Sequence, residues 1–196
     1  MSQAPRDVVQ PTGSPEFWDA RRIGEFASAD VTNDQLVGVA ALLAGGREDD
    51  ATFPREAFEV LMASLRGNRG LTEAGRAAIH FLIVGRLINR VRIEQVLGRH
   101  PAIREERIIR PLVITVMPRA GTTLLLLLLS QDPGSRSLPF WEALQPAPGP
   151  RDWSVDPDPR IAQARQIARA RIERSPQMSS IHATDAFSRE ECTLLL

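Results

Sequence analysis

The sequence predicts an α/β fold in which an all-helical segment, residues 14–109, precedes the start of an α/β domain with a parallel sheet, residues 110–196. Three observations predict this division. Apolar residues recur at helical spacing through most of the first hundred residues. A short apolar, β-branched run over residues 111–116 is typical of a buried parallel strand. A glycine-containing turn and a further helical stretch follow this run directly.

The expected helices are placed by their caps and their periodicity. Residues 1–13 are polar and are expected to form a disordered leader. Thr72 has the residue type and position of an N-cap for the longest helix. Another helix is expected to begin at Asp158–Pro159, with its arginines on a solvated face, and the spacing of Ser188 to Glu191 predicts a helix start. The remaining helices are expected over residues 14–28, 34–44, 54–67 and 73–99, and residues 132–159 are expected to form a loop.

Composition excludes several functional classes. The formal net charge is zero, so no overall positive field favours nucleic acid. All 24 basic residues are arginines, and an oxyanion site must therefore use arginine. The single cysteine, Cys192, forms no internal disulfide, and with no secretory signal visible the expected location is the cytoplasm. Three scattered histidines predict no metal site.

The run of leucines from Leu124 to Leu129 is too short for a membrane span, which takes roughly 20 residues. We expect these leucines to pack in the core, on the helix behind the turn. No integral membrane segment is expected.

The turn itself predicts a phosphate cradle. A helix that begins directly after a strand presents unpaired backbone N–H groups and a positive end at one place. Gly121 lets the backbone approach an anion, and Thr122 and Thr123 add hydroxyl donors. Arg119 can add a two-pronged, charge-assisted contact. The segment departs from the common nucleoside-triphosphate loop, because Val116 stands at the first glycine position of that loop and no lysine is present.

The segment Pro118-Arg-Ala-Gly-Thr-Thr-Leu-Leu resembles the Pro-Arg-Ser-Gly-Thr-Thr signature of sulfotransferases. Over roughly residues 35–196 the chain also resembles a bacterial branch of that family with a helical amino-terminal extension, through stretches such as Leu71–Arg76 and Phe140–Leu144. The resemblance implies a nucleotide-binding fold of the P-loop type. The match corresponds only to the amino-terminal part of such enzymes, so we expect a truncated domain.

The resemblance further implies transfer of a sulfuryl group from 3'-phosphoadenosine-5'-phosphosulfate, without a metal, to a hydroxyl of a small molecule or lipid. Arg119, Ala120, Gly121, Thr122 and Thr123 would bind the donor, and Arg119 would also steady the leaving phosphate. The general base is expected to be Glu142, with His182 as the second candidate.

Two departures from the family pattern stand near the loop: Ala120 replaces its usual serine, and Leu126 and Leu127 replace polar residues. Two other functions stay open. One is a phosphate-loop kinase or nucleotide hydrolase, and the other is a non-catalytic helical interaction module or remnant.

Overall fold

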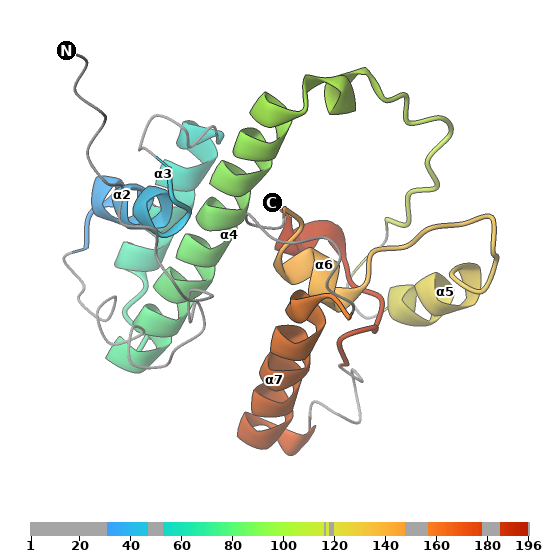
Figure 1. Ribbon diagram of the computed structural model, residues 1–196. Helices are drawn as coiled ribbons and strands as arrows, with labels where there is room; N and C mark the ends of the chain where they lie inside the picture. Colours follow the sequence, from blue (N-terminus) through green and yellow to red (C-terminus); the bar gives the residue numbers. More distant parts are fainter. Residues whose placement is uncertain are drawn as a thin grey trace, which may run out of the picture.

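The computed structural model describes residues 31–46, 53–115, 117, 120–147, 157–177 and 185–195 (Figure 1). In these residues the chain is helical, and none of the helices has the length and apolar character needed to cross a membrane. The expected leader and the expected helix over residues 14–28 lie outside the described residues. The helices are α2 (Asn33–Leu43), α3 (Arg55–Gly67), α4 (Glu73–Arg99), η3 (Pro101–Glu105), α5 (Thr122–Leu129), α6 (Phe140–Leu144), α7 (Pro159–Arg174) and η4 (Cys192–Leu194).

The first core lies between α2, α3 and the long helix α4. The predicted cap at Thr72 is confirmed: its Oγ1 accepts a hydrogen bond from the backbone N–H of Gly75 at 3.0 Å. Thr32, which the sequence analysis did not identify as a cap, forms a capping box with Gln35 at the start of α2. The predicted helices over residues 34–44, 54–67 and 73–99 are confirmed within one residue at each end. The buried side chains of this core are Leu36, Val37, Ala40, Met62, Phe81, Ile83, Val84, Leu87 and Ile88.

A second core lies between α6 and α7 and is closed by the segment from residue 185 onward. This segment pairs with residues 138–141: the N–H of Phe140 donates to the carbonyl of Ser188 at 2.8 Å, and the N–H of Glu190 donates to the carbonyl of Leu138 at 2.9 Å. Phe140 and Ala186 are fully buried there. Segments about 50 residues apart in the sequence are therefore held together by their backbones.

Two local predictions are wrong in this second core. No helix begins over Ser188 to Glu191, because Arg189 forms an antiparallel bridge with Pro139 and the backbone of this segment bonds across to its neighbour. The expected loop over residues 132–159 contains the five-residue helix α6. Its Phe140, Ala143 and Leu144 are buried, so tertiary packing stabilises a helix that is too short to form alone.

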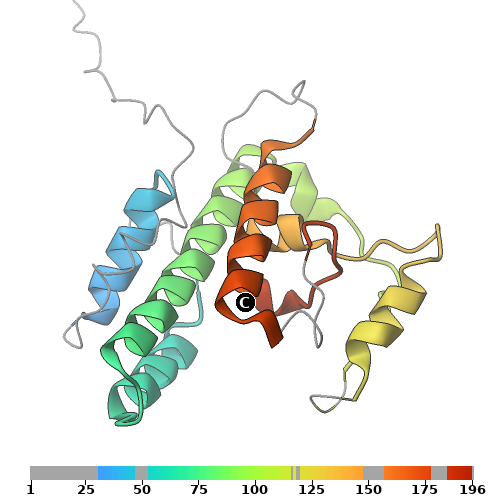
Figure 2. The same ribbon diagram turned by 90° about the horizontal axis from the view of Figure 1, so that it is seen from below.

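The predicted parallel sheet is not seen in the described residues, where the isolated bridge between Pro139 and Arg189 is the β pairing recorded. Residues 111–115 form neither helix nor strand. The expectation that the leucines of α5 pack in a core is also wrong here, since no residue of α5 is buried. In both views α5 lies to one side of the other helices (Figures 1 and 2).

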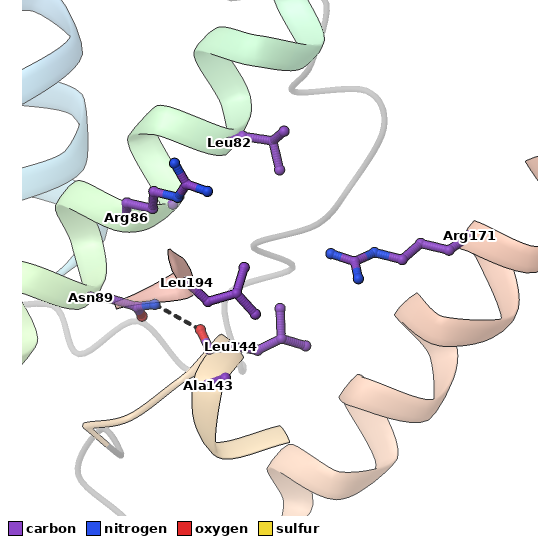
Figure 3. A pocket seen from close by; sticks show the side chains of 8 residues that line it. Leu82, Arg86, Asn89, Ala143, Leu144, Arg171 and Leu194 are labelled. Carbon is purple, nitrogen blue, oxygen red and sulfur yellow. Dashed lines mark hydrogen bonds between the residues drawn. The ribbon is translucent and has the colours of Figure 1, made fainter. Parts of the chain in front are cut away.

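Asn89 of α4 connects the two cores. Its buried side-chain amide donates to the backbone carbonyl of Leu144 at the end of α6, at 2.8 Å (Figure 3). The bond satisfies a carbonyl that the short helix α6 leaves without an intrahelical partner. It also fixes the position of α6 against α4.

We expect Asn89→Ala to lower the free energy of unfolding by about 1–3 kcal/mol, because the carbonyl of Leu144 then stays buried without a donor. Denaturant unfolding followed by circular dichroism measures the change. Arg99→Ala, in the exposed last turn of the same helix, is the control and should change stability by less than about 0.5 kcal/mol. A loss no larger for Asn89→Ala than for Arg99→Ala would contradict the role assigned to Asn89.

Candidate phosphate-binding site

The loop before α5 is shaped by Gly121. This residue is the N-cap of α5 and has φ 86° and ψ 17°, in the left-handed region. A side chain at such a backbone conformation is strained, so glycine is the residue suited to this position. The sequence prediction that the backbone turns sharply here into a helix is therefore confirmed.

The amino-terminal end of α5 leaves backbone donors available. The first hydrogen bond of the helix runs from the N–H of Leu125 to the carbonyl of Gly121, at 3.1 Å. The N–H groups of residues 122–124 precede it and have no acceptor within the helix. Gly121 supplies no side-chain cap. In the part of the chain that the structure describes, no side chain caps this positive end of the helix dipole, which is the arrangement favourable to an anion.

Three of the predicted contact residues lie around this end. Thr122 and Thr123 occupy the first turn of α5 and are half-buried, and Ala120 is exposed in the bend before it. Arg119 lies outside the described residues, as does His182. The roles proposed for these two side chains therefore stay predictions, and so does the binding of an anion by residues 120–123.

Glu142, the first candidate base, lies in the first turn of α6. Its carboxylate forms an ion pair with Arg136 at 2.5 Å, and its side chain is 21% exposed. Arg136 follows the turn around Asp132 that ends α5, where the N–H of Gly134 donates to Asp132 at 2.9 Å. In the described part of the chain no hydrogen bond or ion pair joins Glu142 to residues 120–123.

Sequence reasoning missed this ion pair, because the pair depends on the turn between α5 and α6 and not on spacing within one helix. The pair orients the carboxylate and leaves it partly accessible.

Two arginines of α7 also differ from expectation. Arg160 donates to Asp158 at 2.8 Å and to the carbonyl of Gln145 at 2.6 Å, and its guanidinium lies 4.6 Å from the centre of the Trp141 ring. Arg171 lies 4.8 Å from the centre of the Phe140 ring. The prediction that these side chains form a solvated face is wrong for both, because the aromatic residues of α6 offer them cation–π contacts.

A small pocket lies where α4, α6 and α7 meet (Figure 3). Arg86 and Arg171 face it from opposite sides, and Ala143, Leu144 and Leu194 complete its apolar lining. Burial lowers the pKa of Arg171 from its usual value, while the nearby Glu190 acts to raise it. With a volume of about 30 Å³ the pocket has no room for a nucleotide, which needs roughly 300 Å³ or more. The loop before α5 is therefore the better candidate site.

Comparison with known proteins supports this choice. The sulfotransferase family model matches residues 111–196, the part that contains the loop. The crystal structure of sulfotransferase STF1 from Mycobacterium tuberculosis is 31% identical over 84% of this chain, with a TM-score of 0.68. Residues 111–196 belong to the sulfotransferase family. No curated protein matches it significantly.

A second sulfotransferase structure, STF9 from Mycobacterium avium, is 26% identical over 85% of the chain, with a TM-score of 0.70. The likeness includes the amino-terminal helices as well as the loop, since it extends well beyond residues 111–196. The chain spans 46% of the STF1 chain and 43% of the STF9 chain, which is less than half of either sulfotransferase.

Proposed function

We propose that this chain binds the sulfate donor of a sulfotransferase and takes part in sulfuryl transfer to a hydroxyl of a small molecule or lipid. The donor is 3'-phosphoadenosine-5'-phosphosulfate. The observation that carries the proposal is the uncapped, positive end of α5 behind the left-handed Gly121, within the residues that match the family.

In this proposal both the backbone and the side chains of the loop bind the donor. The N–H groups of residues 122–124 and the hydroxyls of Thr122 and Thr123 bind oxygens of the 5'-phosphosulfate. Ala120 contributes only its backbone, and Arg119 adds a fork of two charge-assisted hydrogen bonds. The positive charge that neutralises the donor comes from arginine and from the helix dipole, so no metal is needed.

The transfer step also needs a base. The acceptor oxygen attacks sulfur, the bond from sulfur to the 5'-phosphate oxygen breaks, and the acceptor's proton must leave. Glu142 is our first candidate to accept this proton, because its carboxylate is partly accessible and oriented by Arg136. His182 is the second candidate. We place the reaction in the cytoplasm, where the single cysteine, Cys192, would stay reduced.

The two alternative functions make different predictions. A phosphate-loop kinase or hydrolase would bind adenosine triphosphate with Mg²⁺, but its loop normally carries a lysine and this sequence has none. An interaction module would bind neither nucleotide. The exposed leucines of α5 are the observation that favours it.

Calorimetric titration of the purified chain separates these functions. We expect saturable binding of 3'-phosphoadenosine-5'-phosphate, the donor without its sulfuryl group, with the same affinity in EDTA and in Mg²⁺. Tighter binding of adenosine triphosphate that depends on Mg²⁺ would replace the proposal with the kinase alternative. Absence of binding to either nucleotide by a folded chain would favour the interaction module.

We expect the double variant Thr122→Val, Thr123→Val to weaken this binding by about 10-fold or more, because valine keeps the shape of threonine but cannot donate to a charged phosphate. Ser64→Ala removes an exposed hydroxyl from α3 and should leave the affinity unchanged. Affinity of the double variant equal to that of the unchanged chain would exclude the two hydroxyls from the site.

A further inference from the structure

The pocket between α4, α6 and α7 has an arginine on each of two facing walls. Figure 3 shows Arg86 of α4 and Arg171 of α7 pointing toward one another across it. Ala143 and Leu144 of α6, together with Leu194, form apolar walls between the two arginines. Two positive charges and an apolar lining therefore meet in one pocket.

The guanidinium of Arg171 is half-buried and has N–H donors to spare. Burial lowers its pKa, because the charged form loses hydration there, and the charge of Glu190 acts to raise the same pKa. The ring of Phe140 lies 4.8 Å from the guanidinium. Among the residues that the structure describes, this guanidinium forms no ion pair and no hydrogen bond. Because a guanidinium carries several N–H donors, its burial without acceptors is unfavourable, and an anion in the pocket would relieve that cost.

Arg86 is in the same position on the opposite wall. Its side chain is exposed, and within the described ranges no ion pair or hydrogen bond joins it to another residue. Two guanidinium groups that face one another repel, so an anion between them removes this repulsion and accepts charge-assisted hydrogen bonds from both. Asn89 also lines the pocket, but its amide already donates to the carbonyl of Leu144 at 2.8 Å. The two arginines are therefore the groups available to a ligand.

The size of the pocket selects the class of anion. Its volume is about 30 Å³. A water-sized group needs roughly 10–15 Å³, so the pocket holds about two such groups, which matches the pair of oxygens in one carboxylate. A tetrahedral oxyanion such as sulfate carries more oxygens and is larger. We propose that Arg86 and Arg171 bind the carboxylate of a small aliphatic acid, with its aliphatic part against the exposed Leu82 at the solvent side of the pocket.

Titration of the ¹⁵N-labelled chain with propionate, followed by NMR, tests the proposal. We expect saturable shifts of the amide signals of Arg86, Leu144 and Arg171, because the ligand lies between the three helices that carry them. Propanamide has nearly the same shape but no charge, and it should produce no saturable shift. Sulfate at equal ionic strength should bind at least about 10-fold more weakly than propionate, because it exceeds the room available. Absence of saturable shifts with propionate, an equal response to propanamide, or an affinity for sulfate as high as that for propionate would overturn the proposal.

Variants of the two arginines test the assigned contacts. Arg86→Met and Arg171→Met keep an apolar stem of similar length, and each should weaken propionate binding by about 10-fold or more, because hydrogen bonds to a charged group are lost. Arg99→Met, in the exposed last turn of α4, is the matched control and should bind as the unchanged chain does.

Arg86→Met gives the decisive result. Because the side chain of Arg86 is exposed, this variant should stay folded even if Arg171→Met, which loses the contact with Phe140, does not. Circular dichroism checks the fold of each variant. A folded Arg86→Met that binds propionate as tightly as Arg99→Met does would refute the site. No residue of the loop before α5 lines the pocket, so a failure of this proposal is distinguishable from a failure of donor binding.

Discussion

Replacement of Arg119 by alanine is expected to weaken binding of 3'-phosphoadenosine-5'-phosphate by at least about 100-fold. Hydrogen bonds to a charged group contribute roughly 1.5–3 kcal/mol each, and a guanidinium can form two of them with one phosphate. The sequence has no lysine, and Arg119 stands directly before residues 120–123. Calorimetric titration measures the effect.

Two further variants give the Arg119 experiment its control. Arg119→Lys keeps the charge but loses the two-pronged geometry, so we expect an affinity between those of the unchanged chain and Arg119→Ala. Arg107→Ala removes an exposed arginine before the loop and should leave the affinity unchanged. Equal affinities for Arg119→Ala and Arg107→Ala would show that Arg119 does not contact the donor.

Gly121→Ala is expected to lower the same affinity by about 10-fold or more. At φ 86° an alanine is strained, and rotation of the backbone to relieve that strain redirects the N–H groups that open α5. Those N–H groups are the proposed phosphate contacts, so a change of backbone angle there acts on binding directly.

Gly45 offers a matched control for this experiment. It has φ 72°, and an added Cβ would meet no neighbour within 4 Å, as is also true of Gly121. Both alanine variants should therefore lower the free energy of unfolding by about 1–2 kcal/mol. Gly45→Ala should leave the affinity for the donor analogue unchanged. If both alanine variants bound the donor analogue as the unchanged chain does, the backbone of the loop would not be the phosphate site.

Local signals in the sequence were sufficient to predict the helices around the first core. Thr72 has a side chain that can accept from the N–H of Gly75, so the start of α4 depends on residues within one turn of it. The turn at Gly121 was predictable for the same reason, because a left-handed backbone favours glycine at that one position. Asp158 likewise caps α7, accepting from the N–H of Arg160 at 3.0 Å.

Elements that depend on distant partners were not predictable. Helix α6 exists because Phe140 is buried beside Ala186, and the backbone at Glu190 is bonded to Leu138 rather than coiled into a helix. The guanidinium of Arg160 packs against the ring of Trp141 instead of extending into solvent. Periodicity within one helix carries no signal for such contacts, since the partners belong to other segments.

The candidate site divides in the same way. The residues of the cradle are consecutive, so one short motif is enough to predict that Ala120, Gly121, Thr122 and Thr123 lie together. A general base comes from a different segment, and the loop motif says nothing about which side chain lies beside it. For Glu142 the contact seen is the ion pair with Arg136. The motif could not reveal that ion pair, because it depends on the turn after α5.

The loop before α5 is the proposed site for the 5'-phosphate of the donor. NMR tests this proposal by following the amide chemical shifts of the ¹⁵N-labelled chain during titration with 3'-phosphoadenosine-5'-phosphate. We expect the largest shifts at residues 120–124, and we expect adenosine 3'-phosphate, which lacks the 5'-phosphate, not to produce them. Saturable binding whose largest shifts lie elsewhere, or equal shifts with both ligands, would show that the loop does not bind the 5'-phosphate.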